Sequence, residues 1–323
     1  MNVRSIQKTR HLVFGALGQD GSYLAEKLVE EGNDVIGVIR NSSIIPSYFL
    51  DKGIKFIRGN ILDSTFISFL LNTYKPTHIY NLASASSVSE SFTHPDLSFQ
   101  INLNFVKLLM DNIEIYRAKS GQETFLLQAS SSEMFGPEHQ NPITESAPHD
   151  PRSPYAEHKS IAHGLCLDAR ENRDLKIATA ILFNHESRRR PLKFVSRKIT
   201  RSAFLISQNR QDFLTLGNIH VSRDWGYAPD YVEAIRQISA NFLSDDFIIA
   251  TGELHSLEDL AQIAFSAVGI ENYLDFISTD KALFRKVDNS GLRGNPNKVV
   301  SRLGWAPKMT FEDMIRTMVS SET

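Results

Sequence analysis

LVFGALGQDGSYLAEKLVEEGNDVIGVIR, residues 12–40, contains the pattern that decides the fold class. The run 12–14 is short and apolar, as in a buried strand, and the apolar residues between 24 and 29 recur at helical spacing. Gly32 ends this predicted helix, and the apolar run 35–39 forms a second strand. A strand, a glycine turn, a helix and another strand together predict a βαβ unit with two parallel strands.

The same alternation of strand and helix continues along the chain. Further strands are predicted at 54–59, 77–84, 124–133 and 176–183, with helices at 64–74, 99–118 and 155–173. Parallel strands joined by helices require right-handed crossovers, which place helices on both faces of the sheet. The predicted fold class is therefore α/β, a Rossmann-type doubly wound parallel sheet with a smaller C-terminal substrate-binding lobe.

The regular alternation of strands and helices ends after residue 183. The segment that follows is basic and loop-like before it becomes helical, a strand is predicted near 247–250, and helices are predicted at 256–269 and in the tail. We therefore expect a Rossmann domain over residues 1–183, to which the chain returns near 220–252. Residues 184–323 are expected to form mainly the smaller, substrate-binding lobe.

Composition excludes several classes of protein. The 323 residues carry 35 basic and 37 acidic side chains, so no strong net charge attracts nucleic acid or anionic lipid. A single cysteine, Cys166, excludes an intrachain disulfide and a cysteine-based zinc cluster. The apolar runs are too short for a membrane span. We expect a cytoplasmic protein with no metal, nucleic-acid or membrane partner.

The glycine turn predicts a dinucleotide site. Gly15, Gly18 and Gly21 form G-x-x-G-x-x-G between a strand and a helix, where glycines let the backbone approach a pyrophosphate. The pattern alone also fits an ordinary tight turn, and the βα context favours the dinucleotide. The second strand ends in Arg40 instead of an acidic residue, which favours NADP over NAD; a surface arginine at a strand end is the alternative.

A second set of residues could carry acid–base chemistry. Ser131 and Glu133 follow the strand at 124–133, and Tyr155 precedes Lys159 by four residues in SPYAEHK, which makes them neighbours on a helix. An ammonium beside a phenol favours the phenolate, and a serine hydroxyl can hold the substrate oxygen. Taken alone, the Tyr–Lys pair also fits a solvated helix start, and Glu133 also fits a cap of the following turn.

In order and spacing these motifs resemble the GDP-mannose 4,6-dehydratases of the extended short-chain dehydrogenase/reductase family. The resemblance covers nearly the whole chain. GQDGSYL, LFNHES and RKIT are specific, whereas the glycine pattern and LGWAPK are shared widely among nucleotide-sugar enzymes. The similar segments are GALGQDGSYLAEKL, ASSSEMFG, PRSPYAEHK, ILFNHESRRR, FVSRKITR, RDWGYAPDYVEA, ATGE and LGWAPK.

The resemblance implies a role for individual residues. Ser131 would bond the sugar 4-hydroxyl, and Tyr155 would be the base at O4. Glu133 would be the base at C5, and Lys159 would hold the nicotinamide ribose. The implied NADP contacts are Gly15, Gly18, Gln19, Asp20, Gly21, Arg40, Asn60, Ile61, Leu82, Ala83, Ser84, Ser86, Tyr155, Lys159, His185 and Arg190. The implied substrate contacts are Ser86, Ser131, Glu133, Asn184, Lys198, Arg223 and Arg285, the arginines suiting a diphosphate.

The implied reaction is NADP-dependent 4,6-dehydration of a GDP-linked sugar, GDP-mannose or a close relative such as a GDP-heptose. Internal hydride transfer from C4 to C6 would give the 4-keto-6-deoxy sugar. An epimerase, a decarboxylase or a reductase on the same scaffold is the nearest alternative, and a non-catalytic dinucleotide-binding protein is a more distant one. Glu133 argues against an epimerase but not against a decarboxylase, and the intact Tyr155 and Lys159 argue against a non-catalytic protein.

The chain also departs from its relatives. Ser87 stands where they carry a larger residue, often histidine, Asn60 stands where they carry an aspartate, and Leu97 replaces a frequent tyrosine. The loop after Arg40 is shorter than in dehydratases whose loop helps to form a tetramer.

Related enzymes pair through two helices, which correspond here to about 99–117 and 155–173. The first carries an apolar stripe that includes Phe105 and Leu109, together with Ile101, Leu108 and Asn112. We expect a homodimer, with a tetramer as the larger alternative; the same stripe would also suit a face packed on the sheet.

Overall fold

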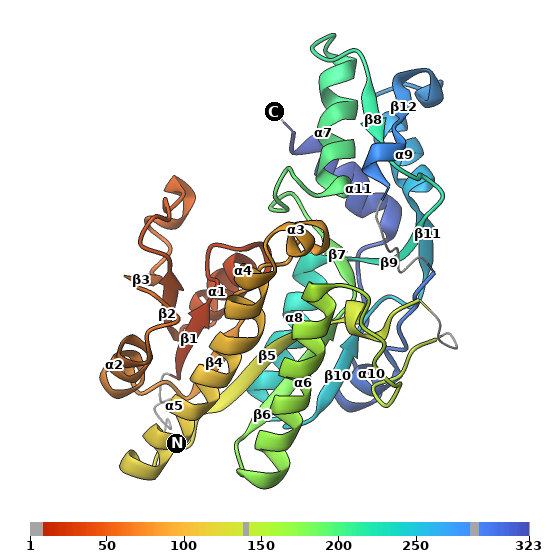
Figure 1. Cartoon of the computed structure of the whole chain (residues 1–323). Helices are drawn as coiled ribbons and strands as arrows, with labels where there is room; N and C mark the ends of the chain where they lie inside the picture. Colours follow the sequence, from red (N-terminus) through yellow and green to blue (C-terminus); the bar gives the residue numbers. More distant parts are fainter. Residues whose placement is uncertain (1–8, 138–141, 285–290, 323) are drawn as a thin grey trace. The chain divides into compact units, whose positions relative to one another are not determined.

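The computed structural model describes residues 9–137, 142–284 and 291–322 (Figure 1). Its large sheet consists of β1 (Arg10–Phe14), β2 (Asp34–Ile39), β3 (Lys55–Arg58), β4 (His78–Asn81), β5 (Phe125–Ser131), β6 (Ile177–Leu182) and β10 (Asp246–Ile249). The strand order is β10–β6–β5–β4–β1–β2–β3, and β1 runs parallel to both β2 and β4. The order reverses between β1 and β4, which confirms the predicted Rossmann-type, doubly wound sheet. The strand predicted near 247–250 is present as β10, which is the edge strand beside β6.

Helices separate these strands. They are α1 (Gln19–Glu30), α2 (Ser64–Tyr74), α3 (Val88–Thr93), α4 (Pro95–Phe99), α5 (Phe105–Ser120) and α6 (Pro154–Asn172), with short 3₁₀ turns η1 (Ser47–Phe49) and η3 (Ser132–Phe135). Of these, α1, α2, α5 and α6 lie where the sequence periodicity predicts a helix.

Local sequence signals explain several helix ends. Asp63 accepts a hydrogen bond from the Thr65 N–H and so caps α2. Gly121 ends α5 in the left-handed region, with φ of +69°, which costs a glycine little.

One predicted helix is interrupted. The sequence predicted a single helix over 99–118, but a π-helical turn, η2 (Gln100–Asn104), separates α4 from α5. π-Helical turns are rare in proteins, and many of those that occur lie at functional sites. This turn places the side chain of Asn102 in the interior of the protein, where it is 1% exposed.

The remaining elements form two smaller sheets and the helices that pack with them. The three-stranded sheet has the order β11–β9–β7 and the two-stranded sheet pairs β12 with β8. The elements are β7 (Asn184–Glu186), α7 (Val195–Ser207), β8 (Leu214–Leu216), β9 (Ser222–Tyr227), α8 (Ala228–Ala240), β11 (Leu254–Ser256), α9 (Leu257–Ser266), η4 (Tyr273–Phe276), β12 (Ile277–Thr279), η5 (Lys281–Leu283), α10 (Asn297–Leu303) and α11 (Phe311–Ser320). Ser256 and Asp259 form a capping box at the start of α9.

The chain divides into two compact units. Unit 1 comprises residues 1–130, 153–180 and 235–246, and unit 2 comprises 131–152, 181–234 and 247–323. Each unit has a hydrophobic core of its own; that of unit 1 includes the packed sides of α2, α5 and α6, and that of unit 2 those of α7, α9 and α11. In the described part of the chain, no helix is both long and apolar enough to cross a membrane.

The apolar stripe on α5 belongs to the core of unit 1. Phe105 and Leu109 are fully buried and Asn112 is 6% exposed. The buried residues of this stripe fit the alternative, a face packed on the sheet, because a helix that covers a sheet must bury one face against it.

Candidate active site

The glycine turn has the geometry that a dinucleotide site requires. Gly15 has φ of +81°, and a Cβ there would lie 2.8 Å from backbone atoms of Leu82 and Ala83. A Cβ on Gly21 would overlap the carbonyl oxygen of Gly15. Gly18 is the N-cap of α1 and has no side chain to bond the first helical N–H groups. The turn therefore brings bare backbone and the positive end of α1 to one place, which suits a pyrophosphate.

The residues that follow Gly18 form the first turn of α1. Gln19 is buried at the start of α1, and its side-chain nitrogen donates to Asp20 Oδ1 at 3.3 Å. Ser22 donates its hydroxyl to the carbonyl of Gln19 at 2.8 Å. These hydrogen bonds stabilise the first turn of α1, which contains Gly21.

Arg40 lies exposed at the end of β2, on a loop that a second arginine shapes. Arg58, at the end of β3, donates one terminal nitrogen to the carbonyls of Arg40, Asn41 and Ser43 at 3.3, 3.0 and 2.6 Å. Sequence reasoning missed Arg58, because an arginine at a strand end carries no signal of its target. Its contacts hold the backbone of the loop that carries Arg40.

Asn60 and Ile61 lie in the turn that follows β3. The Asn60 side-chain oxygen accepts from the Leu62 N–H at 3.0 Å, so this side chain stabilises its own turn. Ile61 packs partly buried against the core of unit 1.

The loop after β4 contains Leu82, Ala83, Ser84 and Ser86, and a residue outside it fixes its path. Asn102 Oδ1 accepts from the Ser84 hydroxyl at 2.8 Å and from the Ala85 N–H at 3.2 Å, and its Nδ2 donates to the Ala85 carbonyl at 3.3 Å. Sequence reasoning missed Asn102; the available signal was a polar residue within an apolar helical pattern. Ser86 is exposed beyond this anchored stretch.

Tyr155 and Lys159 lie on α6 as the sequence predicted. Ser153 caps this helix and Pro154 opens it, so the start of α6 is encoded locally. Both side chains are buried, at 7% and 3% exposure, and Lys159 Nζ lies 6.0 Å from the centre of the Tyr155 ring. This burial excludes a solvated helix start.

The lysine has one further anchor. Its Nζ donates to the Ala129 carbonyl of β5 at 3.0 Å. Burial lowers the pKa of Lys159 to about 8. The protonated, ammonium form of the side chain therefore predominates at neutral pH. A buried ammonium close to a phenol is suited to favouring its deprotonated form.

Two serines that sequence reasoning missed hold α6 in unit 1. The Ser91 hydroxyl of α3 accepts from the Tyr155 N–H at 3.2 Å, and Ser98 of α4 bonds His158 Nδ1 at 2.9 Å. The backbone at Tyr155 is thus fixed by a neighbouring helix as well as by its own.

Ser131 and Glu133 belong to unit 2 and lie together at the end of β5. The Ser131 hydroxyl accepts from the Glu133 N–H at 3.3 Å and caps η3. Glu133 is half-buried on this short turn. The turn ends at Gly136, with φ of +74°, where a Cβ would overlap the Asp150 carbonyl oxygen. A rigid turn of this kind holds a carboxylate in one place.

Asn184 and His185 lie on β7, in the same unit. His185 is buried, its Nδ1 lies 2.7 Å from the Phe183 carbonyl, and its ring stacks on Tyr231 with centroids 4.8 Å apart. A carbonyl only accepts, so Nδ1 carries the hydrogen in this contact. Arg190 lies beside Glu186 on the loop after β7.

The remaining predicted substrate residues are also in unit 2. Lys198 on α7 donates to the Thr215 carbonyl at 2.6 Å, and the buried Arg223 on β9 donates to the Ser222 carbonyl at 2.9 Å. The neighbouring Asp224 accepts from the N–H groups of Thr251, Gly252 and Gly294. Sequence reasoning missed this role of Asp224. Arg285 lies outside the described residues.

Comparison with known proteins assigns the family. The family model for "GDP-mannose 4,6 dehydratase" matches residues 12–318. GDP-mannose 4,6 dehydratase 1 of Arabidopsis thaliana is 38% identical, over 96% of this chain and 89% of that protein. The human GDP-mannose 4,6 dehydratase is 34% identical, over 96% of this chain and 90% of that protein.

Solved structures show the same fold. The UDP-glucose 4-epimerase of Thermus thermophilus, solved with NAD, is 25% identical with a TM-score of 0.84, over 97% of this chain and 99% of that one. RMD from Pseudomonas aeruginosa, solved with NADPH, has a TM-score of 0.80 at 23% identity, over 98% of this chain and 99% of that one. With the family match over nearly its whole length, the chain belongs to the GDP-mannose 4,6-dehydratase family of extended short-chain dehydrogenase/reductase enzymes.

Proposed function

We propose that the protein is a lyase that converts a GDP-linked sugar, GDP-mannose or a close relative, into its 4-keto-6-deoxy form. The observation that carries this proposal is the buried Tyr155–Lys159 pair on α6, in a chain of this family that also holds Ser131 and Glu133 on one rigid turn. A serine, a phenol with its lysine, and a carboxylate are the groups that the reaction needs at O4 and C5.

The proposed chemistry assigns one proton transfer to each base. Tyr155 takes the proton of the 4-hydroxyl while Ser131 holds that oxygen and Lys159 favours the phenolate. The resulting 4-ketone acidifies C5–H, so Glu133 removes that proton and passes it to the 6-hydroxyl, which leaves as water. NADP, when bound, supplies the hydride acceptor and donor, so the sugar loses one water and no external oxidant is consumed.

The Gly15–Gly21 turn, Asn60, Ile61 and the loop Leu82–Ser86 are proposed to hold the dinucleotide, and His185 and Arg190 are proposed as further contacts. Asn184, Lys198, Arg223 and Arg285 are proposed to bind the sugar nucleotide, with Lys198 and the arginines at its diphosphate. Residues 184–323 would thus be mainly the substrate-binding lobe.

The function is tested by incubating the purified protein with NADP⁺ and separate GDP-sugars, including GDP-mannose and a GDP-heptose. Mass spectrometry is expected to show loss of one water from the preferred sugar. Unchanged mass with altered configuration would indicate an epimerase, and loss of carbon dioxide from an acidic sugar would indicate a decarboxylase. Either result would replace the proposal.

We propose NADP as the cofactor because Arg40 directly follows β2 and Arg58 holds the backbone of its loop. Replacing Arg40 with alanine is expected to weaken NADP⁺ binding by roughly tenfold or more, since a charge-assisted contact contributes about 1.5–3 kcal/mol. NAD⁺ lacks the 2′-phosphate and serves as the internal control, with an affinity expected to stay nearly unchanged. Calorimetric titration with each dinucleotide measures the two affinities. An equal loss of affinity for NADP⁺ and NAD⁺ would contradict a contact between Arg40 and the 2′-phosphate.

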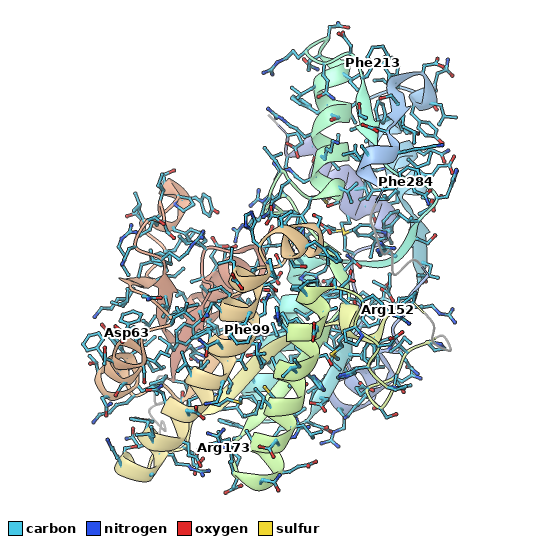
Figure 2. The ribbon with its side chains drawn as sticks, in the orientation of Figure 1. Asp63, Phe99, Arg152, Arg173, Phe213 and Phe284 are labelled. Carbon is cyan, nitrogen blue, oxygen red and sulfur yellow. The ribbon has the colours of Figure 1, made fainter. Side chains whose placement is uncertain are left out.

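We further propose that the protein is at least a homodimer. The support comes from exposed apolar side chains on α4, α5 and α6 of unit 1, three helices that lie beside one another in Figure 1. Phe99, labelled in Figure 2, is 42% exposed. The others are Leu97 at 56%, Ile115 at 50%, Ile161 at 45% and Leu167 at 36%. Apolar residues exposed on adjacent helices are available to a protein interface.

Sedimentation equilibrium at micromolar concentration is expected to give at least twice the chain mass of 36.4 kDa. Replacing Ile115 and Ile161 together with lysine is expected to shift the protein towards the monomer, because each charge would be desolvated in the interface. A wild-type monomer would contradict the proposal. The exposed Phe213 of unit 2, at 63% exposure, offers a control position for the same change to lysine.

A further inference from the structure

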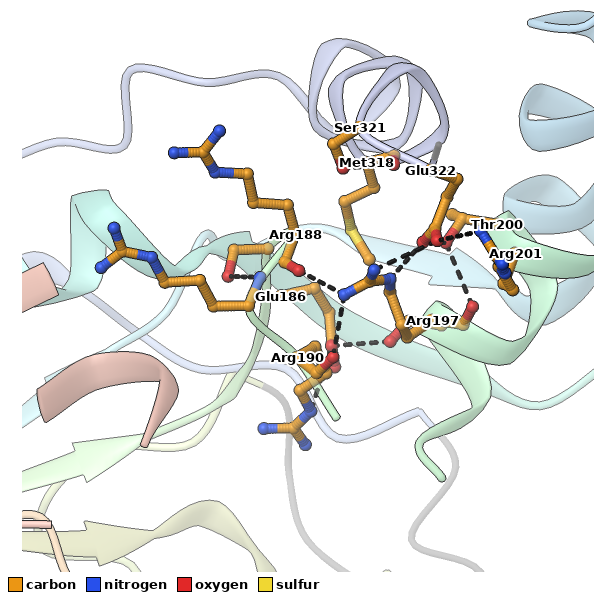
Figure 3. Close-up of polar contacts among 12 residues, drawn as sticks. Glu186, Arg188, Arg190, Arg197, Thr200, Arg201, Met318, Ser321 and Glu322 are labelled. Atoms are coloured by element: carbon orange, nitrogen blue, oxygen red, sulfur yellow. Dashed lines mark hydrogen bonds and ion pairs between the residues drawn. The ribbon is translucent and has the colours of Figure 1, made fainter. Parts of the chain in front are cut away.

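The turn that carries Arg188, Arg189 and Arg190 is built around a buried carboxylate (Figure 3). Glu186, 2% exposed, accepts a hydrogen bond from the Ser196 hydroxyl at 2.6 Å and pairs with Arg190 Nε at 3.2 Å. The Arg190 guanidinium also lies over the Phe194 ring at 3.7 Å. These two contacts use the Nε edge and one face of the guanidinium. Its terminal nitrogens point away from Glu322 in Figure 3.

A second arginine holds the backbone of the same turn. Arg197, on the first turn of α7, donates Nη1 to the carbonyl of Arg188 and, at 3.2 Å, to the carbonyl of Arg190. Because one nitrogen bonds both carbonyls, the backbone from Arg188 to Arg190 is held in one path. Only a planar guanidinium can do this and still present another edge to a further partner.

That further partner is Glu322, which follows α11. Its carboxylate accepts from Arg197 Nε and, at 3.1 Å, from Arg197 Nη2. Thr200 donates its hydroxyl to the same carboxylate at 3.3 Å, and Arg201 Nη1 lies 3.6 Å away. Glu322 is 2% exposed although the residue before it is partly open to solvent. A buried carboxylate with two guanidinium partners holds both in place, because removing it would leave their charge uncompensated.

The chain of contacts therefore runs from α11 through Arg197 to the arginine turn. We propose that Arg197 and Glu322 are positioning residues of the dinucleotide site, which hold Arg190 ready for an anionic group of the cofactor. This inference rests on the proposed function, in which Arg190 contacts NADP. A turn held in its binding conformation spares the ordering cost that a free loop would incur on binding.

Two substitutions test the inference by different routes. Glu322→Gln keeps the shape and removes the charge that holds Arg197 and Arg201. Arg197→Lys keeps the positive charge opposite Glu322 but cannot reach two carbonyls and a carboxylate at once. Glu312→Gln is the matched control, because Glu312 lies on the exposed face of α11 and pairs with Arg316 at 2.8 Å, away from the arginine turn.

The readout is the Kd of NADPH, from its fluorescence on titration with cofactor-free protein, beside the Kd of the GDP-sugar. Both variants are expected to raise the NADPH Kd about three- to tenfold, with the GDP-sugar Kd and the rate at saturating cofactor changed less than about twofold. General destabilisation would instead weaken both ligands, and that outcome would overturn the inference.

The inference would also be overturned if folded Arg197→Lys bound NADPH with the wild-type Kd. This test does not depend on whether Glu322→Gln folds. Wild-type protein that binds no NADPH would refute the proposed cofactor first. The two failures are thus distinguishable by the wild-type titration alone.

Discussion

Tyr155→Phe is expected to stop the reaction at its first proton transfer. The phenylalanine ring fills the same buried space on α6, so the fold and the position of Lys159 should be kept. The 4-hydroxyl then has no base, and a positioned acid–base group typically contributes about 10²–10⁴-fold to the rate. Because no 4-ketone forms, C5–H should also fail to exchange with solvent deuterium.

The measurement is dehydration of the GDP-sugar, followed by mass spectrometry in water and in deuterium oxide. Tyr74→Phe is the matched control, since Tyr74 ends α2 and removal of its hydroxyl should leave the rate unchanged. A Tyr155→Phe variant that dehydrates at the wild-type rate would contradict the role of the phenol and would move the search for the O4 base elsewhere.

Glu133→Gln is expected to stop the reaction one step later. The amide keeps the shape of the side chain on the turn that Ser131 caps, so the Glu133 N–H can still bond the serine hydroxyl. Oxidation at C4 remains possible, but no carboxylate takes the C5 proton. Overall dehydration should fall by about 10²–10⁴-fold, and C5 exchange should be lost.

A single-turnover trap separates the two variants. Protein in excess over GDP-mannose is quenched with borodeuteride, which places deuterium at C4 of any 4-keto sugar. Glu133→Gln is expected to give C4-labelled sugar that retains its 6-hydroxyl, whereas Tyr155→Phe is expected to give none. Glu157→Gln, an exposed position on α6, is the control. If Glu133→Gln dehydrates normally, Glu133 is a structural residue, and the feature that best separates a dehydratase from an epimerase is lost.

The sequence by itself determined the features that depend on near neighbours in the chain. The βαβ alternation follows from apolar periodicity, which one strand or helix expresses within its own length. Gly15 and Gly21 are required because a Cβ would meet backbone within the turn or beside it. Tyr155 and Lys159 meet because four residues on a helix bring side chains to one face.

Only the tertiary structure decided which residues support these groups and which faces are buried. Asn102 reaches the loop after β4, Arg58 reaches the loop after β2, and Glu322 meets Arg197 across 125 residues of sequence. The stripe on α5 could equally have faced a partner, and the packing placed it in the core. No periodicity encodes such contacts, because a hydrogen bond between distant segments depends on where the whole fold brings their ends. An apolar face likewise specifies burial without specifying what buries it.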